Sequence, residues 1–98
     1  MVTRQHSVVW AESARSALDD VIEYIAQDSR QGALHVLDAT LSAASSLNTL
    51  ASRGRAVPEL DDPSMRELFV FRYRLLYRVE PERVVILGFL HGAQDFAT

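Results

Sequence analysis

Arginine recurs in a stretch that otherwise has the composition of a buried β-strand, RELFVFRYRLLYRV at residues 66–79. Strand side chains alternate between two faces, so Arg72, Arg74 and Arg78 share one face with a leucine. The other face suits a covering layer of helices and carries Tyr73, Leu75, Tyr77 and Val79. Guanidinium groups bind carboxylates and phosphates through paired hydrogen bonds. The arginine face is therefore either an exposed sheet face or a platform for an anion or a partner protein.

Two interpretations of this face remain open from the residues alone. In the first, the arginine stems cover apolar neighbours and the guanidinium groups pair with Glu67, Glu80 or Glu82. In the second, the arginines bind an anion or a partner protein. A strand face that only meets water is made more simply with threonine or serine than with bulky arginine. Periodicity does not decide between them.

Motifs for metals, cofactors and nucleophiles are missing from the sequence. His6, His35 and the single Trp10 have no partners at metal-ligand spacing, and the chain has no cysteine. It contains neither a glycine-rich phosphate loop nor a Gly-x-Ser-x-Gly turn. We therefore predict no metal, no cofactor and no small-molecule substrate.

Composition predicts one small globular domain over residues 1–98, with 48% hydrophobic and 23% charged residues. The longest apolar runs, such as residues 84–90, are far shorter than the roughly 20 residues that span a bilayer. The N-terminus lacks the pattern of a signal peptide, and the absence of cysteine excludes disulfides. We expect a cytoplasmic protein that does not cross a membrane.

The charge balance is acidic, although every basic residue is an arginine. Ten arginines and no lysine stand against thirteen acidic residues, which gives a formal charge of −3. Proteins whose affinity depends on neutralising phosphates normally have a basic excess. This chain has no such excess overall.

Two amphipathic helices are predicted in the first half of the chain. The first begins at Glu12 and runs to about Gln27, because apolar residues recur at helical spacing. These residues are Ala14, Leu18, Val21, Ile22 and Ile25. Asp28 or Ser29 caps the second helix, whose apolar stripe continues to residues 50–51, with Gly54 as its left-handed stop. The short connection predicts an antiparallel helical hairpin.

Strand patterns surround this hairpin. A short strand at residues 5–10 precedes it, and an ordered loop at 54–64 leads to strands at 65–71, 73–80 and Arg83–His91. The last strand is apolar on both faces, as expected inside a sheet. Its alternation places Val84, Ile86, Gly88 and Leu90 opposite Val85, Leu87, Phe89 and His91. The predicted class is α+β, with the helical hairpin on one face of a mostly antiparallel sheet.

Four segments carry a resemblance to a known family. They are VVWAESARSALDDVIEYIAQDS at 8–29, GRAVPEL at 54–60, RELFVFRYRLLYRV at 66–79 and RVVILGFLHGAQDF at 83–96. In this order and at this spacing they resemble the RelE/ParE superfamily of type II toxin–antitoxin toxins. The family fold, β-α-α-β-β-β, agrees with the order of elements predicted above. The resemblance implies a bacterial toxin that arrests growth unless a cognate antitoxin binds it.

Two targets are known in the superfamily. RelE-like members cut mRNA on the ribosome, and that activity would assign Arg74 to the charge on the scissile phosphate. His91 would then be a general acid or base, although it equally suits local hydrogen bonding at the sheet end. A second basic residue of many relatives falls at about Gln94 here, which removes a charge from the phosphate site.

ParE-like members instead poison DNA gyrase and need no hydrolytic site. The acidic net charge and the long helix pair favour this branch over the ribonuclease. A third alternative is a toxin fold that has lost its toxicity and only binds its partner. In each case the antitoxin is expected to wrap over the chain, with Arg72, Arg74 and Arg78 contacting its acidic side chains.

Overall fold

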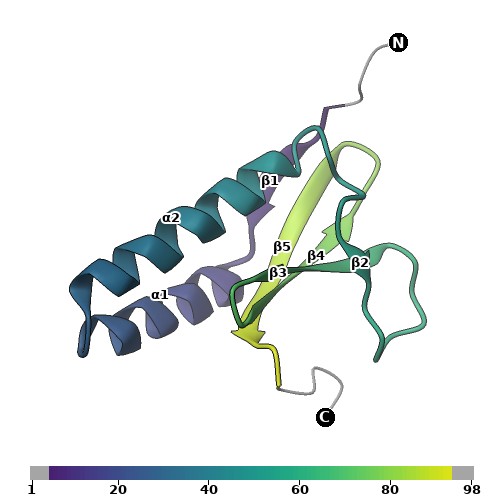
Figure 1. The fold of residues 1–98 in the computed structure, drawn as a ribbon. Helices are drawn as coiled ribbons and strands as arrows, with labels where there is room; N and C mark the ends of the chain where they lie inside the picture. The colour runs from purple at the N-terminus through teal and green to yellow at the C-terminus, as the bar shows by residue number, and fades with distance from the viewer. Residues whose placement is uncertain (1–4, 94–98) are drawn as a thin grey trace.

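The computed structural model describes residues 5–93, which form two helices and a five-stranded sheet (Figure 1). The elements are β1 (Ser7–Trp10), α1 (Glu12–Ala26), α2 (Arg30–Ser46), β2 (Arg55–Ala56), β3 (Met65–Val70), β4 (Tyr73–Val79) and β5 (Arg83–His91). The predicted α+β class and the order of the elements are confirmed, with the two-residue β2 as an addition inside the predicted loop. Neither helix is long and apolar enough to cross a lipid bilayer.

The sheet has the strand order β1-β5-β4-β3-β2. Its pairs are antiparallel except β1 with β5, which run parallel. Strand β5 therefore lies inside the sheet, as its two apolar faces predict. Two short hairpins join β3 to β4 and β4 to β5. The arginine-rich stretch, residues 66–79, spans β3 and β4, so its two halves pair side by side in the sheet.

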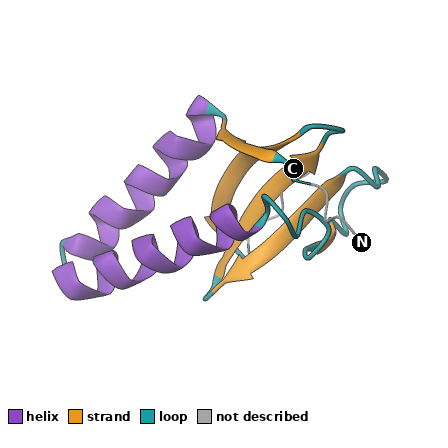
Figure 2. Ribbon diagram, turned by 90° about the horizontal axis from the view of Figure 1, so that it is seen from above, coloured by secondary structure: helices purple, strands orange, loops and turns teal. Residues whose placement is uncertain are grey.

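The helices form an antiparallel hairpin that packs on one face of the sheet and extends beyond it (Figures 1 and 2). Ser29 caps α2, because its side-chain oxygen accepts a hydrogen bond from the Gly32 N–H at 2.9 Å. The predicted end of α2 is wrong. The helix ends at Ser46, and the apolar residues beyond it, Leu47 and Ala51, are buried in a turn rather than in further helix.

Gly54 has a different role from the predicted left-handed helix stop. No glycine of the described chain has a positive φ, so conformational freedom does not explain Gly54. A Cβ at this position would lie 2.5 Å from the Glu67 carbonyl oxygen and 2.5 Å from the Tyr77 hydroxyl. Glycine is therefore required because two neighbouring segments leave no space for a side chain.

The main core lies between the helices and the sheet. Tyr77, Leu75, Val84 and Ile86 are fully buried there, so the predicted helix-facing side of β4 is confirmed. Complete burial of each large apolar side chain contributes about 1.5–3 kcal/mol. The predicted alternation of β5 is wrong beyond Ile86, because an extra residue at Leu87 forms a bulge that reverses the faces.

A second, smaller core lies on the opposite face of the sheet. Its fully or nearly buried members are Val57, Met65 and Leu76, with Leu60, Leu87 and Leu90 packed against them. Residues 57–64, which connect β2 to β3, supply two of these side chains and cover part of this face. The predicted face of exposed arginines is therefore partly enclosed.

Tyr77 is expected to make the stability of the chain fall at alkaline pH. Its side chain is fully buried and its hydroxyl accepts a hydrogen bond from the Gly54 N–H at 2.9 Å. Burial raises its pKa above the ordinary value of 10.0. The folded state then keeps a proton that the unfolded state loses above pH 10, so the unfolding free energy decreases as the pH rises through this region.

Urea unfolding between pH 8 and pH 11 measures this effect. Tyr77→Phe should weaken the alkaline decrease and lower the stability at pH 8 by about 1–3 kcal/mol, because the buried Gly54 N–H loses its acceptor. Tyr24→Phe is the control, since Tyr24 is 75% exposed on α1. An alkaline decrease of the same size in Tyr77→Phe would contradict the assignment.

Candidate functional site: the outer face of the sheet

A buried ion network lies on the outer face of the sheet, the face that points away from the helices. Arg74 of β4 is only 4% exposed and binds Glu59 through two hydrogen bonds, Nη1 to Oε2 at 2.7 Å and Nη2 to Oε1 at 2.8 Å. Its Nε and Nη2 also donate to Oε1 of Glu67, at 2.8 and 2.6 Å. The second oxygen of Glu67 accepts from Nε of Arg55 at 2.6 Å.

The network is balanced in charge, with two guanidinium groups and two carboxylates. The hydrogen bonds that Arg74 donates to Glu59 raise the pKa of Arg74 against the opposing effect of burial, so the guanidinium stays charged. The Glu67 side chain is completely buried and lies between both cations, whereas the Glu59 side chain is 20% exposed. Each buried charge is thus compensated within the fold.

The structure corrects the exposure that alternation predicts for Arg74. Its side chain does project from the face opposite the helices, but residues 57–64 cover it, and Glu59 of this loop reaches its guanidinium. The predicted pairing of an arginine with Glu67 is confirmed. Arg72 and Arg78, by contrast, are exposed at opposite ends of β4 and form no ion pair within 4.0 Å among residues 5–93.

Arg74 and His91, the two residues that a ribonuclease would require, lie on opposite faces of the sheet. Arg74 is paired across the strands with Leu90, and His91 with Tyr73, whose ring packs in the main core. The His91 ring meets the edge of the Tyr73 ring at 5.9 Å, and its Nδ1 accepts a hydrogen bond from the Ala93 N–H at 3.2 Å. The structure therefore does not bring these two groups together, and Gln94 lies outside the described residues.

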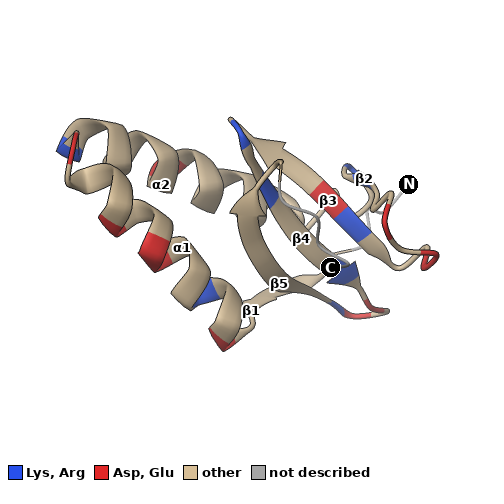
Figure 3. Ribbon diagram, turned by 90° about the horizontal axis from the view of Figure 1, so that it is seen from below, with Lys and Arg blue, Asp and Glu red and all other residues tan. Residues whose placement is uncertain are grey.

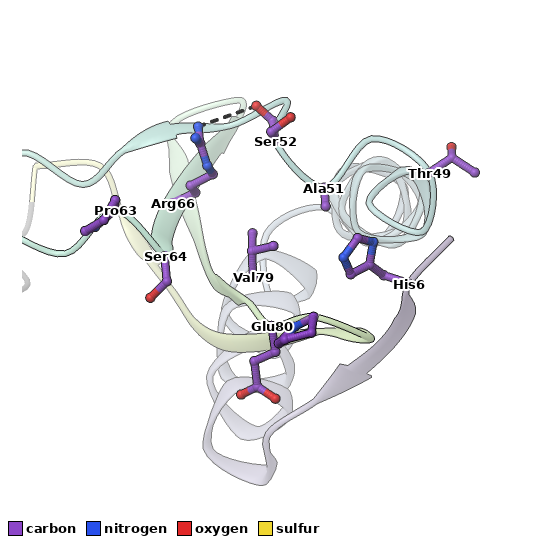
Figure 4. Close-up of a pocket in the computed structure, with 10 residues that line it drawn as sticks. His6, Thr49, Ala51, Ser52, Pro63, Ser64, Arg66, Val79 and Glu80 are labelled. Carbon is purple, nitrogen blue, oxygen red and sulfur yellow. Dashed lines mark hydrogen bonds between the residues drawn. The ribbon is translucent and has the colours of Figure 1, made fainter. Parts of the chain in front are cut away.

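A hollow of about 640 Å³ opens between the start of β1 and the turns around residues 51, 64 and 80 (Figure 4). Arg66 points across one side of it and donates to the carbonyl oxygens of Gly54 at 2.6 Å and Ser52 at 3.5 Å. His6 borders the other side, and its buried Nδ1 has no hydrogen-bond partner among the described residues. The guanidinium in this hollow thus serves to fix the chain around Gly54.

Charge is distributed unevenly over the molecule. Acidic positions recur along α1, whereas most arginine positions lie on the strands and the turns beside them (Figure 3). Within residues 5–93, no group of three or more His, Asp or Glu side chains is arranged to hold a metal ion. Residues 12–46 carry six acidic residues and two arginines, whereas residues 53–93 carry six acidic residues and seven arginines. The net negative charge therefore lies on the helical hairpin, and the sheet side is close to neutral.

Comparison with known families identifies the fold. The family model of the ParE toxin of the type II toxin–antitoxin system, parDE, matches residues 8–96. The chain belongs to the ParE toxin family. The match extends over nearly all of the sequence, so it includes both helices and every strand from Val8 onward.

Two solved structures have the same fold as this ParE-family chain. One is from the chromosomal ParDE toxin–antitoxin system of P. aeruginosa, with a TM-score of 0.72, 21% identity, and coverage of 90% of this chain and 97% of that one. The other is from the toxin–antitoxin complex RelBE2 of Mycobacterium tuberculosis, with a TM-score of 0.59, 21% identity, and coverage of 89% and 98%. No sequence among the curated proteins compared with the chain matches it.

The sequence reveals neither Arg55, which lies in the two-residue strand β2, nor the second network carboxylate, Glu59. Glu59 lies 15 residues before Arg74, in a loop whose path has no periodic signal. Glu67 is easier to find, because it shares a face with Arg74 on the neighbouring strand, one position diagonal to the Phe69–Arg74 pair. A carboxylate within an apolar strand is the signal that a buried cation lies nearby.

Proposed function

We propose that this chain is the toxin of a type II toxin–antitoxin module and that it arrests growth by binding DNA gyrase rather than by cutting RNA. The observation that carries the proposal is the state of Arg74. Arg74 is 4% exposed, and its guanidinium is hydrogen-bonded to the carboxylates of Glu59 and Glu67. It supports the covering loop instead of facing an incoming ligand.

Electrostatics favours a protein target over an RNA phosphate at this position. A phosphate approaching Arg74 meets the carboxylate of Glu59 first, and the network has no net positive charge to offset the repulsion. The imidazole of His91 lies across the sheet and cannot share a substrate with Arg74. A chain with a formal charge of −3 also gains little from the counterion release that drives binding to RNA.

Production of the toxin in growing bacterial cells without its antitoxin tests the proposal. We expect filamentation, DNA damage and relaxed plasmids, because a gyrase inhibitor blocks supercoiling. Co-production of the protein encoded by the adjacent reading frame should restore growth. Rapid arrest of translation with cleaved transcripts would instead support the RelE-like ribonuclease, and unimpaired growth would indicate a relative without toxicity.

We expect two of the three arginines, Arg72 and Arg78, to contact the antitoxin. Arg72 precedes β4 and Arg78 lies near its end, so the two cations are about 20 Å apart along the strand. Both are exposed, while Arg74 between them is enclosed. One compact acidic group cannot reach both cations, and we therefore expect a long acidic segment of the antitoxin to follow the strand from one end to the other.

Charge reversal of these two arginines is expected to weaken antitoxin binding. Arg72→Glu and Arg78→Glu should each lower the affinity for the protein of the adjacent reading frame about tenfold at low salt, and less at 0.5 M salt. Isothermal titration calorimetry measures both values. Arg15→Glu, at an exposed position on α1, is the matched control and should bind like the wild type. If all three variants bind with the same affinity, the proposed contact of Arg72 and Arg78 with the antitoxin is rejected.

A further inference from the structure

Phe71 is the one described residue other than glycine that has a positive φ, at 55°. It is the first residue of the two-residue turn between Val70 and Tyr73, which pair across β3 and β4. A positive φ at the first turn position alone matches a type II′ turn, in which glycine or asparagine is normally found. A bulky aromatic side chain in this conformation strains the backbone.

Burial of the Phe71 ring does not offset the backbone strain. Phe71 is 57% exposed, and its described ring contact is with His35 of α2, at 5.2 Å between ring centroids. His35 is itself exposed, so the contact removes little apolar surface from water. The sequence thus keeps an aromatic residue where glycine would fit better and where the chain's own fold gains little from the ring.

An open groove of about 830 Å³ begins at this turn and continues to the end of the helical hairpin. Phe71, Arg72 and Tyr73 border it from the sheet, and the end of α1 borders it from the other side. On that side Tyr24 is 75% exposed and Asp28 lies near the start of α2. Exposed Tyr, Phe and Arg side chains around a concave surface are typical of the residues that dominate protein–protein binding energy.

We propose that Phe71 is held in its strained conformation as an anchor for the antitoxin. An apolar side chain of the antitoxin enters the groove between Phe71 and Tyr24, and an acidic neighbour pairs with Arg72. The choice of occupant follows from charge, because Arg72 has no ion pair within 4.0 Å in residues 5–93 and stands at the rim of an aromatic groove. This inference rests on the proposed function, since it assumes an antitoxin partner.

Phe71→Gly separates the stability of the chain from its binding. The glycine relieves the backbone strain, so the melting temperature should rise by about 4–8 °C. Affinity for the protein encoded by the adjacent reading frame should fall about tenfold or more, because the anchoring ring is gone. Phe71→Tyr keeps the ring in the same conformation and should retain both the wild-type affinity and the wild-type melting temperature.

Two further variants complete the test. Tyr24→Ala, on the exposed side of α1, should lower the affinity to a similar extent without changing the melting temperature. Leu50→Ala removes an apolar side chain of similar exposure, 54%, beyond the far end of α2 and should leave the affinity unchanged. If the wild type binds this protein and Phe71→Gly binds it with the same affinity, the role of Phe71 as an anchor is overturned, but the antitoxin partnership is not. A wild-type chain that does not bind this protein would overturn the antitoxin partnership and the anchor together.

Discussion

Replacing Arg74 by methionine is expected to lower the unfolding free energy by about 3–5 kcal/mol, a large part of the total of about 5–15 kcal/mol for a domain of this size. The change removes the cation that binds both Glu59 and Glu67. Glu67 then keeps only Arg55, whose side chain is 59% exposed, while its own carboxylate stays completely buried. An incompletely paired buried charge is far more costly than a broken surface ion pair.

Urea unfolding at pH 7 measures the effect of Arg74→Met. Arg83→Met is the matched control, because Arg83 forms an exposed ion pair with Glu80 at 2.6 Å and should contribute at most about 1 kcal/mol. The double variant Arg74→Met with Glu67→Met should recover much of the loss, since both buried charges are then removed together. A loss below 1 kcal/mol for Arg74→Met would show that the network does not hold the loop.

Gly54→Ala is expected to destabilise the fold by about 2–3 kcal/mol, at the upper end of the usual cost of overpacking. The added Cβ would lie 2.5 Å from the carbonyl oxygen of Glu67, which is part of the β3 backbone. It would also displace the Tyr77 hydroxyl, the acceptor for the Gly54 N–H. The substitution therefore disturbs the attachment of the loop and a buried hydrogen bond at once.

Thermal unfolding followed by circular dichroism measures this change. Gly88→Ala is the control, because a Cβ at Gly88 would meet only the Leu76 side chain, at 3.4 Å or more. It should change the stability by less than about 1 kcal/mol, since the contact is an ordinary one and alanine suits a strand at least as well as glycine. Similar melting temperatures for the two variants would contradict the role of Gly54.

Local patterns predict much of this fold because they reflect local physics. Period-two alternation places Tyr77 in the main core and Arg74 on the opposite face. Helical spacing predicts both helices, and the predicted bounds of α1 agree with the observed bounds to within a few residues. The same patterns do not reveal the bulge at Leu87, because an extra residue in one strand changes nothing in the composition. The face of His91 depends on that bulge.

The features that define the candidate site depend on contacts distant in sequence. Glu59 reaches Arg74 only because residues 57–64 fold back over the sheet, and a loop of this kind has no periodic signal. The strain at Phe71 is likewise hidden, since phenylalanine is a common strand residue and only the turn geometry gives it a positive φ. The arginines were visible in the sequence, but their separation into enclosed and exposed groups was not.

We propose that this ParE-family toxin acts on a protein target and that Arg74 stabilises its fold. Purified toxin, added to DNA gyrase with relaxed plasmid and in parallel to a translating extract with a reporter mRNA, tests this claim most directly. We predict that supercoiling is inhibited in proportion to the toxin, that the protein of the adjacent reading frame reverses the inhibition, and that the mRNA stays intact. Normal supercoiling together with cleavage of the mRNA would contradict the account.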